Sequence, residues 1–468
     1  MVDIFMRAIT ALNDYCLGYV LMGALTTVGI YFTVTTRFVQ FFNPRSIIGL
    51  LIQGNSKKGH ISPFQAFAIS TASRVGTGNI AGVALAITLG GPGAIFWMWL
   101  IAVFGAASSF IESTLAQIYK VPTAGHFRGG PAYYMQYALG MRKLAVAFSI
   151  IITLTFALTF NSVQANTIAQ SLYNSFQFPL YISGIILTCL SALIIFGGLR
   201  RIAQFSAIIV PVFALGYIAL TVIIMLLNLP KLPGVFTLIF SDAFSWHNLT
   251  GGTLGATIMM GARRGLFSNE AGMGSAPNAA ATANTSHPVK QGYVQALGVF
   301  VDTLIICSCT AFFILLSDYQ TSSAQGIGLT QFALTSEMGN IGNYFLTASV
   351  LLFAFTSIIG NYYYGQANVE FLTTNKKCML GFRACVCLMI FLGTVAQLGL
   401  VWNLADLFMT VMALMNLYAI FRLRKQALAV LADYRQQKAQ GKDPHFYPDQ
   451  VPCVGKTMAW HLSTTETK

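Results

Sequence analysis

Long apolar stretches, separated by short polar segments, occupy most of the chain. A helix needs about 20 apolar residues to cross a bilayer. The pattern therefore predicts eleven membrane-spanning helices, at roughly residues 15–36, 61–89, 91–119, 144–171, 180–198, 202–228, 248–283, 291–317, 340–371, 379–399 and 403–421. We expect an all-α polytopic membrane protein that ends in a polar tail without a hydrophobic core of its own.

Composition supports this interpretation and argues against most soluble classes. Of the 468 residues, 55% are hydrophobic and only 9% are charged, against about 25% charged residues in a typical soluble domain. The net charge of +13 does not indicate nucleic-acid binding, because the basic residues are dispersed in loops beside the apolar stretches. The eight cysteines show no zinc-binding spacing, and most lie within apolar stretches, so we expect neither a disulfide framework nor a metal centre.

The distribution of Lys and Arg predicts the orientation in the membrane. If the N-terminus is outside, most of the 27 basic residues fall in cytoplasmic loops or in the tail, which is the bias typical of membrane proteins. Arg7 and Lys231 fall outside, while Arg74, Arg263 and Arg264 fall within the membrane. We expect a multi-pass protein of the cell (inner or plasma) membrane with an external N-terminus and a cytoplasmic C-terminus.

A polar segment interrupts the second apolar stretch at residues 73–82, Ser-Arg-Val-Gly-Thr-Gly-Asn-Ile-Ala-Gly. Glycine in a helix interior costs about 1 kcal/mol, and arginine at the bilayer centre costs about 2.5 kcal/mol or more. Non-helical backbone at that depth is tolerated only where it is buried in protein or lines a cavity. We therefore expect a broken helix that forms a ligand site; the alternative is a glycine kink for close helix packing.

A second interruption is expected in the seventh apolar stretch, near residues 261–274. Two glycines there bracket two arginines, and Ser268 or Asn269 is placed to cap a restarted helix with Glu270 in its first turn. The broken helices are thus the second and the seventh, and paired broken helices in inverted repeats point to the site of a secondary transporter. The expected organisation is an N-terminal helix, two inverted five-helix repeats and a cytoplasmic tail, at residues 1–36, 61–228, 248–421 and 422–468.

The two breaks have backbone groups that suit an amino-acid zwitterion. A carboxylate binds well to free N–H groups at a helix N-terminus. A helix that restarts near Asn79 would offer the N–H groups of Thr77, Gly78 and Asn79. Unwound carbonyls near Met260 and Gly261 are expected to accept hydrogen bonds from the ammonium group.

Amide side chains in the fourth stretch are further candidates. Asn161 and Gln164 are three residues apart and so share one face of the helix. Buried amides are costly unless they have partners. They either line the substrate cavity, which we favour for Gln164, or hold two helices together.

Charged residues within the membrane need partners. Arg74 and Glu270 both lie on the cytoplasmic side of a break, and we expect them to approach each other and to gate the inward path. Alternatively, Arg263 and Arg264 are the partners of Glu270 or donate to carbonyls at a helix end. Three further acidic residues are either ion or proton sites or hydrogen-bond partners between helices: Glu112, Asp302 and Glu370.

Four segments resemble one transporter family. Residues 90–105, Gly-Gly-Pro-Gly-Ala-Ile-Phe-Trp-Met-Trp-Leu-Ile-Ala-Val-Phe-Gly, closely resemble the signature of the sodium:alanine symporter family. Residues 74–82, 261–272 and 356–362 resemble its other recurrent segments. The resemblance extends to about residue 421 and implies a LeuT-type fold that takes up a small neutral amino acid, alanine or glycine, with Na⁺.

The same resemblance implies a sodium site between the first broken helix and the helix that carries Thr356 and Ser357. Carried onto this chain, its ligands are the carbonyls of Ser73, Gly76 and Phe353 and the hydroxyls of Thr356 and Ser357. Such oxygens suit a coupling ion held by unwound backbone. The alternative for the two hydroxyls is a hydrogen bond back to their own helix.

The leading interpretation is a sodium-coupled symporter that works by alternating access. A proton-coupled transporter of the same fold is the alternative, and a passive channel is a weaker one. An enzyme is not expected, because the only dinucleotide-like segment, Gly76–Gly82, has GxGxxxG spacing and follows no strand. The expected partners are a small neutral amino acid, Na⁺ and the lipid bilayer; the oligomeric state is left open.

Overall fold

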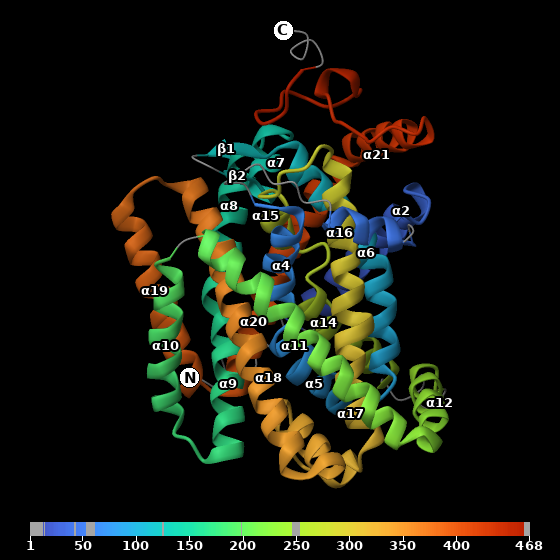
Figure 1. Ribbon diagram of the computed structural model, residues 1–468, viewed down its shortest axis with the longest axis vertical. Helices are drawn as coiled ribbons and strands as arrows, with labels where there is room; N and C mark the ends of the chain where they lie inside the picture. Colours follow the sequence, from blue (N-terminus) through green and yellow to red (C-terminus); the bar gives the residue numbers. More distant parts are fainter. Residues whose placement is uncertain are drawn as a thin grey trace.

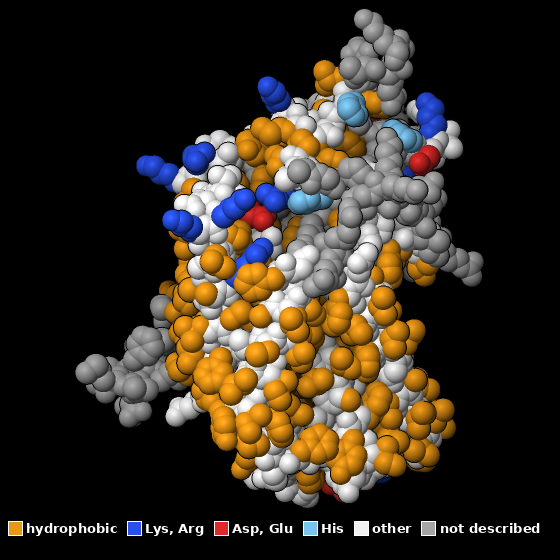
Figure 2. Space-filling view, turned by 60° about the vertical axis from the view of Figure 1, so that its left-hand side comes forward, with side chains coloured by type: hydrophobic (Ala, Val, Ile, Leu, Met, Phe, Trp, Pro, Cys, Tyr) orange, Lys and Arg blue, Asp and Glu red, His pale blue; other side chains and the backbone are white. Residues whose placement is uncertain are grey.

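The computed structural model describes residues 13, 15–41, 44–52, 61–123, 126–197, 199–245 and 253–462. In these residues the chain is almost entirely helical (Figure 1), and the only sheet is a hairpin of β1 Val121–Thr123 and β2 His126–Arg128. Eight described helices are long and apolar enough to cross a membrane. Figure 2 shows hydrophobic side chains over the lower part of one face and Lys and Arg near its upper end.

The helices of the first half follow the expected stretches closely. Their bounds are η1 Cys16–Leu21, α2 Met22–Thr35, η2 Val39–Phe41, α3 Pro44–Ile52, α4 Pro63–Arg74, η3 Gly78–Gly82, α5 Val83–Gly90, α6 Ala94–Ile118, α7 Pro131–Tyr137, α8 Arg142–Ile152, η4 Thr153–Phe160, α9 Asn161–Phe176, α10 Leu180–Ile195, α11 Leu199–Leu227, η5 Leu229–Lys231 and α12 Leu232–Ala243.

The second half is helical in the same way. Its elements are α14 Thr253–Asn269, α15 Ala276–Ala280, α16 Pro288–Phe300, η6 Val301–Cys307, α17 Ser308–Leu316, η7 Tyr319–Thr321, α18 Ile327–Leu372, α19 Lys376–Val395, α20 Leu398–Arg422, α21 Arg424–Ala439 and η8 Pro448–Gln450. Within α18, Gly339 has φ 63° and ψ −154°, so a kink separates a shorter helix from the apolar one that follows it. The start of the expected stretch 248–283 lies outside the described residues, and the count of eleven spans remains a prediction.

The first break lies where the sequence predicts it. Ser62 and Gln65 form a capping box that starts α4, and the helix ends at Arg74. Val75 is extended, with φ −77° and ψ 93°, and the helix resumes at Gly78 as η3 and then α5. Residues 75 and 76 therefore depart from the helical pattern in the middle of the molecule.

The second break is displaced from its predicted position. Helix α14 continues through Gly261 to Asn269, and the non-helical segment is 270–275, where Glu270, Gly272 and Gly274 have φ values of 57°, 78° and 86°. Ser268 and Asn269 therefore end a helix instead of capping a new one. At Gly261 a side chain would place its Cβ 2.3 Å from the Ala94 carbonyl oxygen, so this glycine allows α14 to approach α6.

The central helices surround both breaks. Helix α6 packs against α14 and α16, and α18 packs against α9 and α4. Helices α10 and α19 lie side by side at one edge (Figure 1), where α19 also contacts α9. This arrangement places the unwound backbone of both breaks in the buried core of the molecule.

Candidate functional site

The first break presents backbone N–H groups to side-chain oxygens. Thr77 donates its N–H to Oε1 of Gln164 at 2.9 Å, and Gly76 donates to Oδ1 of Asn79 at 2.9 Å. Gln164 comes from α9. The sequence had indicated Thr77, Asn79 and Gln164 as substrate-site candidates, and Gly76 as a sodium ligand. The structure thus brings Thr77, Asn79 and Gln164 together, with oxygen acceptors at positions that a carboxylate also suits.

Aromatic rings cover this break from one side. The rings of Phe160 and Phe267 have centroids 4.5 Å apart, and those of Phe267 and Trp402 are 4.6 Å apart. A Cβ at Gly78 would lie 2.9 Å from Cδ1 of Phe267, so the absence of a side chain at Gly78 lets α14 meet the break. Sequence analysis had no signal for Phe267 or Trp402, because an aromatic residue in an apolar stretch resembles many others.

The predicted carbonyl acceptors at Met260 and Gly261 are wrong. Both residues lie in the continuous part of α14, where carbonyls accept hydrogen bonds from their own helix. The end of α14 approaches the first break instead: the Cα of Ser268 lies 3.1 Å from the Cβ position of Gly78. The last carbonyls of a helix lack partners within it and carry its negative dipole end.

The second break is held by a buried carboxylate. Glu112 of α6 is completely buried. Its Oε1 accepts the N–H of Gly272 at 3.2 Å, and its Oε2 accepts the N–H of Gly274 at 3.0 Å and Nδ2 of Asn416 at 2.7 Å. Asn416 in turn accepts a hydrogen bond from the hydroxyl of Tyr134. Of the two roles left open for Glu112, the structure supports the interhelical hydrogen-bond partner.

Five oxygens converge between α4 and α18. The hydroxyl of Ser357 lies 2.9 Å from the carbonyl of Ala72, 3.2 Å from that of Val75 and 3.0 Å from that of Phe353. The hydroxyl of Thr356 donates to the carbonyl of Phe353 at 2.8 Å. Both hydroxyls therefore make the bond back to their own helix, and Ser357 also joins α18 to the end of α4.

The carbonyls that Ser357 contacts in α4 and the first break lie one residue before two of the expected ligands. The contacts of Ser357 include the carbonyls of Ala72 and Val75, but not those of Ser73 and Gly76. The direction in which these carbonyls point depends on how the helix end is rotated about its axis. The side-chain sequence does not indicate this rotation. Gly76 is still required here, because a Cβ would lie 2.2 Å from Oγ of Ser357 and 2.8 Å from Oε1 of Gln164.

Arg74 and Glu270 have separate hydrogen-bond partners. Arg74 donates to the carbonyl of Gln295 at 3.2 Å and to Oγ of Ser109 at 3.3 Å. The carboxylate of Glu270 accepts the hydroxyls of Ser73 and Ser275, each at 2.7 Å. Glu270 therefore connects the two breaks through serines, and the direct contact with Arg74 is not formed.

The structure gives Arg264 a different partner from the one considered. Arg264 of α14 forms an ion pair with Asp406 of α20, and its guanidinium lies 4.5 Å from the ring centroid of Trp402. All three side chains are buried. No direct contact with Glu270 is described for Arg264, and the alternative pairing from the sequence is therefore wrong for this residue.

The remaining acidic candidates differ in their surroundings. Asp302, completely buried in η6, accepts Nδ2 of Asn79 and Oγ of Ser268, each at 2.7 Å, and the hydroxyl of Thr303 at 3.0 Å. It thereby links the first break to the end of α14. Glu370 instead pairs with Arg128 at 2.9 Å in a partly exposed position, which is a structural role.

Comparison with known proteins identifies the family of this chain. The model of the sodium:alanine symporter family matches residues 2–448. The chain is 51% identical to the probable sodium/glutamine symporter GlnT of Bacillus subtilis (strain 168), over 97% of this chain and 96% of the relative. It is 36% identical to the sodium/proton-dependent alanine carrier protein of Bacillus sp. (strain PS3), over 86% of this chain and 94% of the relative.

The fold is similar to that of a solved transporter. A crystal structure of a mutant manganese transporter from Eremococcus coleocola has a TM-score of 0.52, with 14% identity and 84% of each chain covered. At this identity the likeness concerns the fold alone. The chain belongs to the sodium:alanine symporter family: it is a sodium-coupled membrane transporter and not an enzyme.

Proposed function

We propose that the protein takes up a small neutral amino acid together with Na⁺ by alternating access. One observation carries the proposal: residues 72–79 supply both the carbonyls that meet Ser357 and the N–H group of Thr77, which meets Gln164. A single segment around the first break thus serves a cation on one side and a carboxylate on the other. Binding of either ligand then orders backbone that the other one uses.

The sodium ion is held by the five oxygens between α4 and α18. These are the carbonyls of Ala72, Val75 and Phe353 and the hydroxyls of Thr356 and Ser357. Neutral oxygens of this kind, from unwound backbone and hydroxyls, are typical of sodium sites in secondary transporters. Sodium there ties the first broken helix to α18 and shifts the population toward the form that binds the amino acid.

The amino acid lies between two opposed helix ends. Its carboxylate replaces the oxygen of Gln164 at the N–H group of Thr77. It also accepts from the N–H groups of Gly78 and Asn79, where the restarted helix has its positive dipole end. Its ammonium group faces the last carbonyls of α14, beside Ser268. This assignment replaces the one made for Met260 and Gly261 and uses the contact between Gly78 and α14.

The size of the side chain is limited by the rings of Phe160, Phe267 and Trp402. We propose alanine or glycine as substrate, and the name of the relative GlnT adds glutamine to the amino acids that must be compared. Competition against labelled alanine by glycine, L- and D-alanine and glutamine ranks them directly. A preference for glutamine would show that the rings of Phe160, Phe267 and Trp402 leave room for a longer side chain.

The protein crosses the cell membrane with its N-terminus outside and its C-terminus in the cytoplasm. Basic side chains gather at the upper end in Figure 2, the end at which the C-terminal helix α21 lies in Figure 1. Residues 61–228 and 248–421 are proposed as inverted repeats, because each contains one broken helix. The exposed Cys453 tests the orientation: an impermeant maleimide should label it only in inside-out vesicles.

Proton coupling remains the second candidate, favoured by one feature. The buried carboxylate of Asp302 accepts hydrogen bonds from Asn79 of the first break and Ser268 of α14. Protonation of Asp302 would therefore weaken the hydrogen bonds of both residues. Imposed gradients of Na⁺, K⁺ and pH across liposomes separate the candidates. Accumulation of labelled alanine driven by Na⁺ supports the proposal; accumulation driven only by a pH gradient contradicts it, and equilibration without accumulation indicates a channel.

A further inference from the structure

The C-terminal segment folds back over one end of the molecule. Residues 424–439 form α21, and the chain then continues without a long helix to residue 462 (Figure 1). The sequence predicts a tail without a core of its own, yet Tyr434 and Phe446 are 2% and 3% exposed. The tail therefore buries aromatic side chains against the transporter body.

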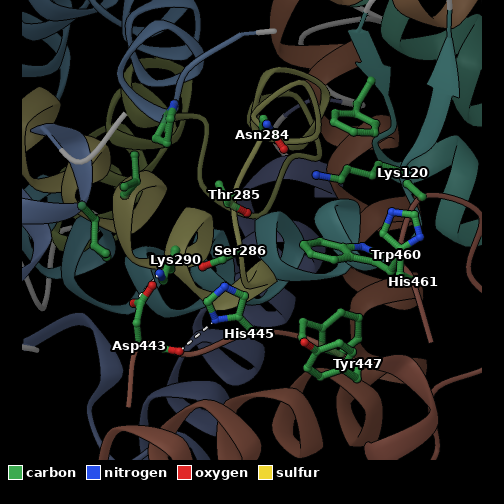
Figure 3. Close-up of a pocket in the computed structure, with 16 residues that line it drawn as sticks. Lys120, Asn284, Thr285, Ser286, Lys290, Asp443, His445, Tyr447, Trp460 and His461 are labelled. Atoms are coloured by element: carbon green, nitrogen blue, oxygen red, sulfur yellow. Dashed lines mark hydrogen bonds and ion pairs between the residues drawn. The ribbon is translucent and has the colours of Figure 1, made fainter. Parts of the chain in front are cut away.

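The first anchor of the tail is the loop between α15 and α16. Phe446 donates its N–H to the carbonyl of Ser286 at 3.0 Å, and the hydroxyl of Ser286 donates to the carbonyl of Pro444 at 2.9 Å. Lys290 pairs with Asp443 at 2.7 Å; Figure 3 shows the two side chains meeting beside Ser286. Backbone and side-chain contacts together fix the register of the tail on this loop.

A histidine strengthens this anchor. His287 caps α16, is completely buried, and lies 3.1 Å from the carboxylate of Asp433 in α21. Its ring also contacts those of Tyr434 and Phe446, with centroids 5.1 Å and 5.6 Å away. Helix α21 and the extended segment thus converge on one residue of the loop.

The second anchor is the end of α6. Trp460 donates its indole N–H to the carbonyl of Gln117 at 2.9 Å. The ammonium of Lys120 lies 4.6 Å from the ring centroid of Trp460 and also donates to the carbonyl of Ala283 at 2.9 Å. Between the two anchors is a cavity of about 700 Å³, lined in part by Thr285 and His445 (Figure 3), so the tail spans this surface without being packed against all of it.

The loop under the tail connects both broken helices. It follows α15, the short helix after the second break, and Asn284 donates its N–H to the carbonyl of Ile61 at 3.0 Å. Ile61 also forms a bridge with Ala283 and immediately precedes Ser62, the cap of α4. A segment that binds residues 283–290 therefore restrains both the N-terminal end of α4 and the C-terminal end of α15.

We propose that residues 424–462 form a strap that favours closure of this end of the transport path. The inference rests on the proposed function, because alternating access requires α4 and α15 to separate here when the site opens. The strap makes its contacts only while the loop and the end of α6 keep their present positions. It therefore shifts the population toward the closed form by the free energy of those contacts.

The test measures access to the closed end directly. A cysteine is placed at Thr282, which is completely buried beside α15, in a background whose native cysteines are replaced by serine. Its reaction rate with an impermeant maleimide is measured in inside-out vesicles, without amino acid. Trp460→Ala removes a hydrogen bond, a cation–π contact and the edge-to-face contact with the ring of Phe446. It should raise the rate about tenfold.

Matched variants distinguish the strap from general damage. Met458→Ala truncates a half-exposed side chain two residues away and should leave the rate unchanged. Lys290→Asp should raise the rate about two- to fivefold, the range of a partly exposed pair, and Lys290→Asp with Asp443→Lys should restore it. Melting temperatures of the purified variants show whether each is folded; the charge-swapped pair provides the test if Trp460→Ala is not.

The outcomes separate this inference from the proposed function. Unchanged rates in folded Trp460→Ala and Lys290→Asp variants, while the parent protein shows Na⁺-driven uptake, overturn the strap and leave symport intact. Raised rates, while no uptake responds to Na⁺, overturn the proposed function and leave the strap as a restraint on this end. Equal effects of Met458→Ala and Trp460→Ala also overturn the strap.

Discussion

Replacing Ser357 by alanine tests the sodium site most specifically. The hydroxyl of Ser357 lies within 2.9–3.2 Å of the carbonyls of Ala72, Val75 and Phe353, so it is the side chain that joins α18 to the first break. Alanine removes this oxygen and keeps the rest of the helix. We expect a weaker apparent affinity for Na⁺ and little change in the rate at saturating Na⁺.

The size of the effect follows from the contacts. A hydrogen-bonding contact with a charged group is worth about 1.5–3 kcal/mol, and each 1.4 kcal/mol corresponds to about a tenfold change in a binding constant. The variant also leaves carbonyls in the sodium-free form without the hydroxyl donor, which costs that form about 1 kcal/mol and offsets part of the loss. We therefore expect the Na⁺ concentration for half-maximal uptake to rise about tenfold.

The assay is uptake of labelled amino acid into proteoliposomes over a series of Na⁺ concentrations at constant ionic strength. Ser349→Ala is the matched control: Ser349 is completely buried in the same helix, but its hydroxyl donates only to the carbonyl of Phe345 in its own helix, at 2.8 Å. This variant should keep the parent's Na⁺ dependence. An unchanged Na⁺ dependence in Ser357→Ala, or an equal shift in both variants, refutes the assignment.

Three further predictions follow from the two breaks and the strap. Gly78→Val should abolish uptake without preventing membrane insertion, because its Cβ would lie 2.9 Å from the ring of Phe267; uptake at the parent rate contradicts this. Glu112→Gln should lower stability by about 2 kcal/mol or more, because the NH₂ group of glutamine would face an N–H group that now donates to the carboxylate. The loss should appear as a lower melting temperature in detergent. Glu370→Gln, in a partly exposed ion pair, should lower it less. Burial lowers the pKa of His287 below its ordinary value of 6.5, although Asp433 opposes this, so the docked tail is most stable above pH 6.5 and is weakened as the pH falls through the lowered pKa. Maleimide access at the Thr282 position should accordingly rise on acidification, and this rise should be reduced in His287→Gln.

The first break and the second illustrate what a sequence specifies. Two glycines around a threonine, close to an arginine in a membrane-length stretch, located the first break, because both residue types are costly in a regular spanning helix. The same reasoning failed at Gly261, where the glycine serves contact with α6 and the helix continues. The actual break at 270–275 depends on Glu112, a residue of another helix, whose carboxylate accepts the freed N–H groups.

Side-chain candidates were easier to select than their partners. Gln164 was chosen as a polar residue in an apolar stretch and Ser357 through the family resemblance, and the structure places both at the first break. Thr356, chosen through the same resemblance, donates to the carbonyl of Phe353 in its own helix. The pairing of Arg264 with Asp406 depends on how α14 and α20 pack, which apolar periodicity does not encode. For the same reason the sequence did not indicate that Ser357 would contact the carbonyls of Ala72 and Val75.

The most direct test of the account is reciprocal binding of Na⁺ and amino acid to the purified protein. Because we propose that residues 72–79 serve both ligands, saturating Na⁺ should raise the affinity for alanine, or for whichever amino acid competes best, relative to K⁺. Saturating amino acid should raise the affinity for Na⁺ by the same factor, as linkage requires, and Ser357→Ala should reduce that factor in both directions. An amino-acid affinity that is equal in Na⁺ and in K⁺ would contradict the shared segment and the symport built on it.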